Sequence, residues 1–125
     1  MMTSQLTPAK KILICDDEES IVEIMNIVLS EKGYQIKTLS DAQDIFKVIE
    51  RWKPDLIFID LWMPEISGDE VVRELKRNKK TAHIPVIIVT ANKDSQKIAN
   101  AVNANDYISK PFDIIELENM AEKYL

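Results

Sequence analysis

Four short apolar runs in this chain each end on polar or charged side chains. The runs occupy residues 11–15, 56–59, 86–89 and 107–109. The side chains that follow them are Asp16 and Asp17, Asp60, Thr90, and Lys110. Runs of isoleucine, valine and leucine without alternation are typical of strands buried on both faces of a parallel sheet. Because parallel strands open their carboxyl ends along one edge, where open α/β sheets bind ligands, we expect these polar groups to gather at one rim.

The groups expected at this rim favour phosphoryl chemistry. Three carboxylates offer the oxygen ligands that a metal cation such as Mg²⁺ prefers. The threonine hydroxyl and the lysine ammonium offer hydrogen bonds and positive charge to an anion such as phosphate. A cation and a phosphate held on neighbouring strand ends form the arrangement that phosphoryl transfer uses.

Length and charge narrow the class of protein. A chain of 125 residues is long enough for one domain with a real core. A net charge of −5 argues against a direct nucleic-acid surface, which would be basic. No apolar stretch approaches the roughly 20 residues of a membrane span. Residues 1–9 lack the features of a signal peptide, and we expect a flexible tail there, a single domain over residues 10–125 and a cytoplasmic location.

Helical patterns lie between the apolar runs from start to finish, which predicts βαβ units. Apolar side chains at helical spacing form the faces of five expected helices. They are Ile21, Ile24, Met25, Val28 and Leu29; Ala42, Ile45, Phe46 and Ile49; Val71, Val72 and Leu75; Ile98, Ala101 and Val102; and Leu117, Met120, Ala121 and Tyr124. Residues 35–39 alternate polar and apolar side chains, which predicts a half-exposed edge strand. Cys15, within the first run, is expected to be a small buried hydrophobe.

Local signals predict where the helices begin and end. Gly33 and Asn103 are expected as helix stops, because both residues tolerate positive φ. Asp113 is expected to cap the last helix. Two capping boxes are also expected, Ser40 with Gln43 and Ser67 with Glu70.

Five strands and five helices in strict alternation predict an α/β fold, a doubly wound (βα)5 domain of the flavodoxin type. Right-handed crossovers leave few topologies for such a chain, and we expect a five-stranded parallel sheet in the order 2-1-3-4-5. This order places the switch point between the first and third strands. It brings Asp16 and Asp17 beside Asp60, with Thr90 and Lys110 on the next strands.

Taken together, the motifs resemble those of a response-regulator receiver domain of two-component signalling, of the single-domain type. They are Asp16-Asp17-Glu18, Asp60-Leu61-Trp62-Met63-Pro64, Ser67-Gly68, and residues 84–91 and 106–112. The resemblance spans residues from about 10 to 125, in order and at the spacing of the family. Each motif alone is weak, but the set is highly specific.

The resemblance implies a role for each residue of the rim. Asp60 would be the phosphoacceptor, because a carboxylate can take a phosphoryl group as an acyl phosphate. Mg²⁺ would be bound directly by Asp17 and Asp60, through water by Asp16, and by the backbone carbonyl of Trp62. Lys110 and Thr90 would neutralise the phosphoryl oxygens in the transition state. Thr90 would also act with Tyr107 as a conformational switch, and a cis Lys110–Pro111 bond is implied.

The implied function is that of a phosphoacceptor in a phosphorelay rather than a turnover enzyme. The domain would take phosphate from a sensor histidine kinase or phosphotransfer protein and lose it by autodephosphorylation. It would signal to a downstream protein through its fourth helix, fifth strand and fifth helix, roughly residues 94–124.

Simpler interpretations exist for the same residues. Asp60 could cap a following helix, although Pro64 interrupts the chain there. The acidic residues 16–19 could favour a helix N-terminus, which explains Glu18 and Glu19 better than two adjacent strand-end aspartates. Lys110 could be a solvated loop residue, and Tyr107 a strand tyrosine with an exposed hydroxyl.

Three other functions fit the pattern less well. An aspartate-nucleophile phosphatase would want a second acid two residues after the nucleophile, where Trp62 stands. A flavodoxin-type nucleotide binder would want more than the two glycines present, and acids after the first strand would repel its phosphate. A receiver-like module without phosphorylation would not need the full acidic, threonine and lysine set.

Overall fold

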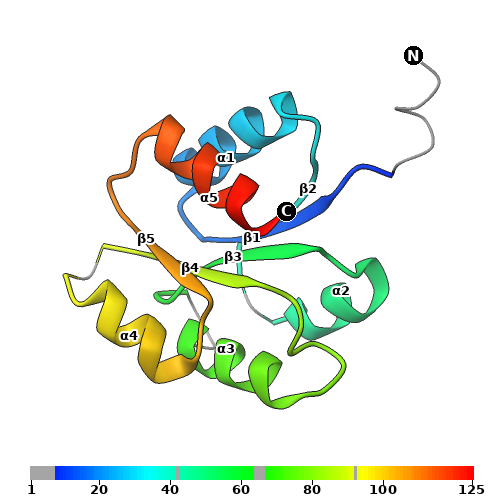
Figure 1. Ribbon diagram of the computed structural model, residues 1–125, viewed down its shortest axis with the longest axis vertical. Coiled ribbons are helices and arrows are strands. Elements are labelled where there is room, and N and C mark those ends of the chain that lie inside the picture. Colours follow the sequence, from blue (N-terminus) through cyan, green and yellow to red (C-terminus); the bar gives the residue numbers. More distant parts are fainter. Residues whose placement is uncertain (1–7, 42, 64–66, 92) are drawn as a thin grey trace.

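The computed structural model describes residues 8–41, 43–63, 67–91 and 93–125, which form alternating strands and helices (Figure 1). The strands are β1 (Lys11–Cys15), β2 (Gln35–Leu39), β3 (Leu56–Asp60), β4 (Val86–Thr90) and β5 (Asp106–Ser109). The helices are α1 (Glu19–Glu31), α2 (Ile45–Trp52), α3 (Gly68–Arg77), α4 (Ser95–Val102) and α5 (Ile114–Tyr124). The predicted alternation is confirmed. The predicted tail falls largely outside the described residues and stays a prediction.

The strands form one parallel sheet in the order β2-β1-β3-β4-β5, as predicted. Cys15 pairs with Ile59 across β1 and β3, so the residues that follow them, Asp16 and Asp60, emerge side by side. Thr90 pairs with Ser109 across β4 and β5. The register therefore delivers the polar strand ends to one edge.

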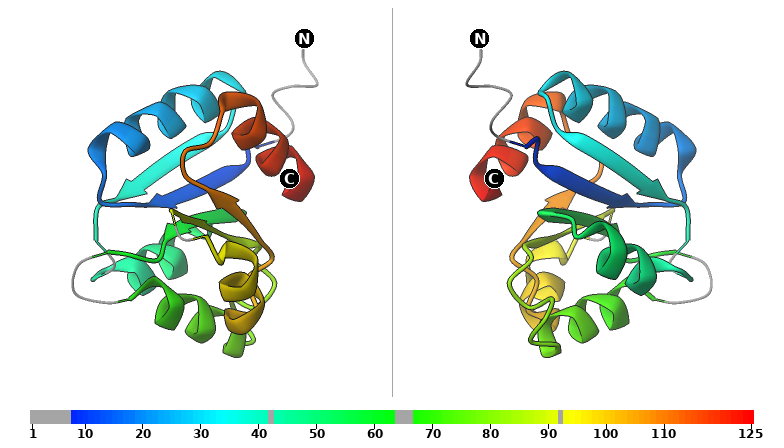
Figure 2. Two further views of the ribbon diagram at one scale, coloured as in Figure 1. Left: turned by 90° about the vertical axis from the view of Figure 1, so that its left-hand side faces the viewer. Right: turned by 90° about the vertical axis from the view of Figure 1, so that its right-hand side faces the viewer.

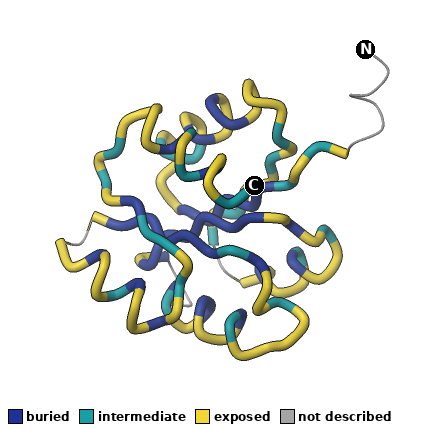
Figure 3. The backbone as a smooth tube through the Cα atoms, viewed as in Figure 1, coloured by how far each residue is buried: buried dark blue, intermediate teal, exposed yellow. Residues whose placement is uncertain are grey.

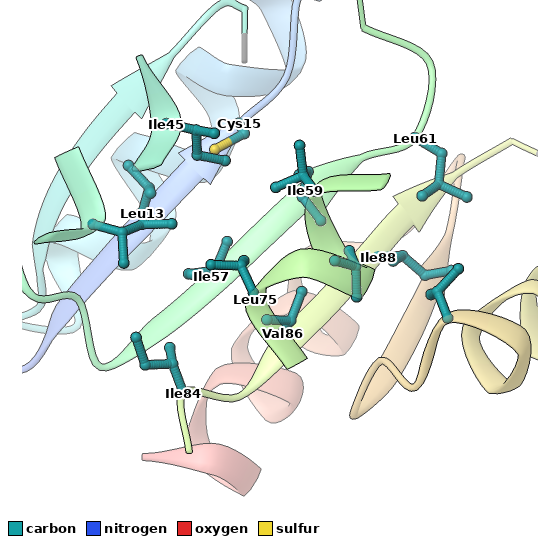
Figure 4. Close-up of a cluster of buried hydrophobic side chains, with 14 of the residues drawn as sticks. Leu13, Cys15, Ile45, Ile57, Ile59, Leu61, Leu75, Ile84, Val86 and Ile88 are labelled. Carbon is teal, nitrogen blue, oxygen red and sulfur yellow. The ribbon is translucent and has the colours of Figure 1, made fainter. Parts of the chain in front are cut away.

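Helices cover both faces of the sheet. In Figures 1 and 2, α1 and α5 lie on one face and α2, α3 and α4 on the other. Each face has its own apolar cluster, because successive strand residues point to opposite sides. Leu13, Ile57 and Ile88 join the cluster under α2–α4, drawn in Figure 4. Ile12 and Phe58 join the cluster under α1 and α5.

Burial is concentrated in the three central strands, as Figure 3 shows. All of β3 and β4 is buried, and β1 is buried apart from its first residue. A fully buried aliphatic or aromatic side chain contributes roughly 1.5–3 kcal/mol, so these strands hold much of the stability. Cys15 is buried among them, as predicted, and β2 is the half-exposed edge strand. No helix in the described part of the chain is long and apolar enough to span a membrane.

Several helix ends follow the predicted signals. Gly33 follows α1 with φ 94°, and Asn103 ends α4 with φ 62°. Asp113 caps α5, because its carboxylate accepts a hydrogen bond from the Glu116 amide at 2.7 Å. Ser67 stands at the N-cap of α3, as predicted, but its side chain accepts no capping hydrogen bond. The predicted start of the helix is therefore confirmed, and the predicted capping box is not formed.

The capping box at Ser40 and Gln43 is wrong. Helix α2 begins at Ile45 after Asp44, because the Asp41 carboxylate accepts the Gln43 amide at 2.9 Å and turns the chain before the helix. Ala42 lies outside the described residues.

Three apolar side chains assigned to buried faces are exposed instead. They are Ile24, Phe46 and Ala101. Ile24 precedes buried Met25 by one residue, about 100° around the helix, and the face of α1 that packs on the sheet carries Met25, Val28 and Leu29 instead. In α4 the small buried residue is Ala99, which lies three residues before buried Val102.

Candidate functional site

The predicted carboxylates do come together at the carboxyl edge of the sheet. One oxygen from each of Asp16, Asp17 and Asp60 lies within 4.8 Å of the others. Asp16 and Asp60 are buried, and Asp17 is exposed at the mouth. Thr90 is fully buried at the end of β4, where its carbonyl accepts the Lys110 amide at 2.9 Å. The gathering of the three carboxylates at one rim is therefore confirmed, and Thr90 ends the neighbouring strand.

Asp60 is the last residue of β3 and both of its carboxylate oxygens are engaged. Oδ1 accepts the backbone amide of Trp62 at 3.0 Å, and Oδ2 accepts a hydrogen bond from Lys110 Nζ at 3.2 Å. Gly68, at the start of α3, packs against the same segment. A Cβ at Gly68 would lie 2.6 Å from the Asp60 carbonyl oxygen. Only glycine allows α3 to begin so close to the end of β3.

Lys110 connects the rim to the other side of the site. Its ammonium lies 2.9 Å from Asp16 Oδ2, 2.9 Å from Glu18 Oε1 and 3.2 Å from Asp60 Oδ2. Its side chain is only 11% exposed. Burial opposes the charge of Lys110, but the hydrogen bond to Glu18 and the charges of Asp16 and Asp60 outweigh it and raise the pKa of Lys110. Lys110 is therefore a largely covered, ion-paired cation rather than a solvated loop residue. The Lys110–Pro111 bond is cis, as the resemblance implied.

Both carboxylate oxygens of Asp16 have a partner. Oδ1 accepts the Glu18 amide at 2.9 Å, and buried Oδ2 is ion-paired with the Lys110 ammonium at 2.9 Å. Burial is the main cause that raises the pKa of Asp16, and the charge of Asp60 adds to it, while the Glu18 amide and Lys110 oppose the rise. Two more carboxylates lie beside Asp16. Three clustered carboxylates against one lysine leave excess negative charge, which suits a hard divalent cation such as Mg²⁺.

Glu18 is a member of the site that sequence reasoning misses. The sequence suggests an acid that favours the N-terminus of a helix, but the side chain makes no capping hydrogen bond and reaches Lys110 instead. The two residues are 92 positions apart, so no local pattern could have paired them.

The remaining predicted site residues are placed as follows. Tyr107 is half-buried and packs against the apolar cluster under α2–α4. The Trp62 side chain is 66% exposed beside Asp60. Pro64 lies outside the described residues. The roles assigned to Tyr107 and to the Trp62 carbonyl stay predictions.

Comparison with known proteins gives the site a family. The family model described as "Response regulator receiver domain" matches residues 12–122. The chain is 43% identical over 110 residues to the phosphate regulon transcriptional regulatory protein PhoB of Pseudomonas aeruginosa, a match to 86% of this chain and 48% of PhoB. It is 38% identical over 105 residues to PhoP of Bacillus subtilis, the alkaline phosphatase synthesis transcriptional regulatory protein, with 82% and 43% covered. The chain thus spans less than half the length of these curated relatives.

Solved structures show the same fold. The receiver domain of the sensor histidine kinase PA1611 from Pseudomonas aeruginosa PAO1, whose active-site cleft coordinates a magnesium ion, superposes with a TM-score of 0.84 at 24% identity, covering 94% of this chain and 98% of that one. With a family model that spans nearly the whole chain and relatives above 30% identity, this chain belongs to the response regulator receiver domain family of two-component signalling.

Proposed function

We propose that Asp60 is the phosphoacceptor of this receiver domain. The observation that supports it best is a buried strand-end carboxylate held by the Trp62 amide and the Lys110 ammonium, beside two more aspartates. A carboxylate oxygen of Asp60 would attack the phosphorus of a phosphohistidine on a sensor kinase or phosphotransfer protein. The new O–P bond forms as the N–P bond breaks, and the electron pair leaves with the imidazole nitrogen. Lys110, which already contacts Asp60, would pair with the charge on the phosphoryl oxygens.

We propose that Asp17, Asp60 and the Trp62 carbonyl hold Mg²⁺ directly, with Asp16 contributing through water. When bound, the ion would supply positive charge to the carboxylates and the phosphoryl oxygens. The close approach of the three carboxylates supports this site. The magnesium ion in the cleft of PA1611 supports it by analogy of fold.

We further propose that Thr90 and Tyr107 transmit phosphorylation to a protein target through α4, β5 and α5. Thr90 lies at the end of β4, where its carbonyl accepts the amide of Lys110, and Tyr107 lies on the adjoining strand β5. In this proposal the domain acts in the cytoplasm, contacts proteins rather than nucleic acid, and is restored by autodephosphorylation rather than by turnover of a substrate.

Phosphorylation by a small donor tests the assignment of Asp60. With acetyl phosphate and Mg²⁺, intact-mass spectrometry should show one added phosphoryl group that hydroxylamine removes. The Asp60→Asn variant should stay unlabelled, and removal of Mg²⁺ with EDTA should abolish labelling of the wild type. Asp44→Asn is the matched control, because Asp44 is exposed at the start of α2 and its side chain makes no capping hydrogen bond. Labelling of Asp60→Asn at the wild-type level would refute the assignment.

Fluorescence tests the metal ligands. In a Trp52→Phe background, Mg²⁺ should change the emission of Trp62 in a saturable way, because its carbonyl is a proposed ligand. No titratable change would count against that ligand.

Amide hydrogen exchange tests the output surface. Phosphorylation should alter exchange near Ile98 and Tyr107 more than in α2, because α2 follows β2, at the opposite edge of the sheet from β5. Equal changes in α2 and at these two residues would contradict the proposed surface.

A further inference from the structure

Glu18 makes an unusual contact for a residue at the start of a helix. It occupies the N-cap position of α1, yet its side chain makes no capping hydrogen bond. The chain turns there because the Glu18 amide donates to Asp16 Oδ1 at 2.9 Å. The Glu18 carboxylate accepts a hydrogen bond from Lys110 Nζ at 2.9 Å, although the side chain of Glu18 is 56% exposed.

Glu18 differs from the other two carboxylates that hold Lys110. An ammonium has three hydrogens, and here it faces three carboxylates. Asp16 and Asp60 also belong to the group of aspartates that could hold a cation, whereas Glu18 does not. Of the three carboxylates that contact Lys110, Glu18 is therefore the one that does not also belong to the proposed cation site.

We propose that Glu18 is a positioning residue for phosphorylation of Asp60 and that it acts through Lys110. This inference rests on the proposed function of Asp60. With acetyl phosphate, an O–P bond to Asp60 forms while the bridging P–O bond of the donor breaks, and the electron pair leaves with acetate. During this step Lys110 keeps its proton, and its hydrogen bond to Asp60 Oδ2 is replaced by a hydrogen bond to a phosphoryl oxygen. Glu18 holds a second hydrogen, so that Lys110 stays over the reacting atoms.

Three variants separate this role from a plain charge effect. Glu18→Ala removes both the charge and the hydrogen bond, whereas Glu18→Gln removes the charge but keeps an amide oxygen that can accept from Lys110. Glu19→Ala is the matched control, because Glu19 is the adjacent acid, is exposed and lies in the first turn of α1. The measurement is the rate constant for acyl phosphate formation with acetyl phosphate and Mg²⁺, followed by intact mass.

The proposal predicts that Glu18→Ala slows phosphorylation by about threefold to tenfold, the equivalent of one partly exposed hydrogen bond to a charged group. Glu18→Gln should recover most of the rate, and Glu19→Ala should match the wild type. Wild-type or faster rates in Glu18→Ala would overturn the proposal. So would a Glu18→Gln variant as slow as Glu18→Ala, or an equal loss in Glu19→Ala.

A second readout does not depend on activity. In EDTA, Glu18→Ala should lower the urea midpoint in the wild-type background and leave it unchanged in a Lys110→Ala background. An equal shift in both backgrounds would show that Glu18 does not act through Lys110. Asp60→Asn is measured in the same phosphorylation assay. Labelling of Asp60→Asn would refute the proposed function. If Asp60→Asn stays unlabelled and Glu18→Ala is phosphorylated at the wild-type rate, only the role of Glu18 is overturned.

Discussion

The substitution Asp60→Asn should make the metal-free domain more stable, because it removes one charge from a crowded acidic site. Asp16 and Asp17 lie within 4.8 Å of Asp60, and Lys110 lies 3.2 Å from it. At an effective dielectric of ~20, each repulsion costs at least about 3.5 kcal/mol and the attraction contributes about 5 kcal/mol. The two repulsions together therefore exceed the attraction by about 2 kcal/mol. Solvent around exposed Asp17 screens its repulsion with Asp60. We therefore expect Asp60→Asn to raise the free energy of unfolding by about 1 kcal/mol.

Two further effects also favour a more stable Asp60→Asn variant. The Asp60 side chain is nearly buried, so the substitution also removes the cost of keeping a charge away from water. The asparagine amide oxygen can still accept from the Trp62 amide, and Lys110 keeps Asp16 and Glu18 as partners, so the variant need not leave either donor unpaired.

Urea unfolding of both proteins, with EDTA and with Mg²⁺, measures the effect. In EDTA the variant should have the higher midpoint. Mg²⁺ should stabilise the wild type by mass action and the variant less, because one ligand charge is gone. Asp44→Asn serves as control and should respond to Mg²⁺ as the wild type does. A variant less stable than the wild type in EDTA would show that the attraction between Asp60 and Lys110 outweighs the repulsion among the carboxylates. Equal stabilisation of both proteins by Mg²⁺ would show that Asp60 does not contribute to the cation site.

The same site predicts a pH dependence. The pKa of Asp16 is raised, chiefly by burial, so the folded protein holds that proton more tightly than the unfolded chain does. The contribution of Asp16 to stability is then greatest below its ordinary pKa of 3.8 and falls as pH rises through the raised value. Asp60→Asn should weaken this fall, because the charge of Asp60 is one of its causes. If Asp60→Asn leaves the pH dependence of stability unchanged, the charge of Asp60 does not contribute to the raised pKa of Asp16.

Three further predictions concern other parts of the fold. Gly68→Ala should destabilise the domain by about 1–3 kcal/mol and slow phosphorylation, because the added Cβ meets the backbone at the end of β3; Glu70→Ala, on the exposed face of α3, should do neither. Cys15 should resist Ellman's reagent in the native protein and react in urea, because burial raises the pKa of its thiol. Burial opposes the charge of Asp106, but the hydrogen bonds from Lys123, the Tyr107 amide and Tyr124 together outweigh it and lower the pKa of Asp106. Asp106→Asn should therefore lower the urea midpoint at neutral pH, and the difference should vanish as pH falls below about 3.8 through the lowered pKa.

The amino-acid sequence alone was enough to predict the architecture and most of the residues at the site. Unbroken apolar runs have no polar face, so they must lie in the interior of a sheet covered on both sides. Handed crossovers then leave an order in which Asp16 and Asp60 emerge from neighbouring strands, as the pairing of Cys15 with Ile59 shows. Gly33 and Asn103 end helices as predicted, because positive φ is a property of the residue itself.

Packing and loop geometry settled the details that no local pattern contains. Whether Ile24 or Met25 faced the core depended on how α1 sits on the sheet, since both lie in one apolar stretch. The start of α2 depended on a turn closed by Asp41 rather than on helix propensity. The contact of Glu18 with Lys110 depended on the turn after β1 and on the β4–β5 register together, because it joins side chains 92 residues apart. Local patterns predict elements and their order, but a side-chain contact between distant loops exists only once the sheet has fixed where those loops meet.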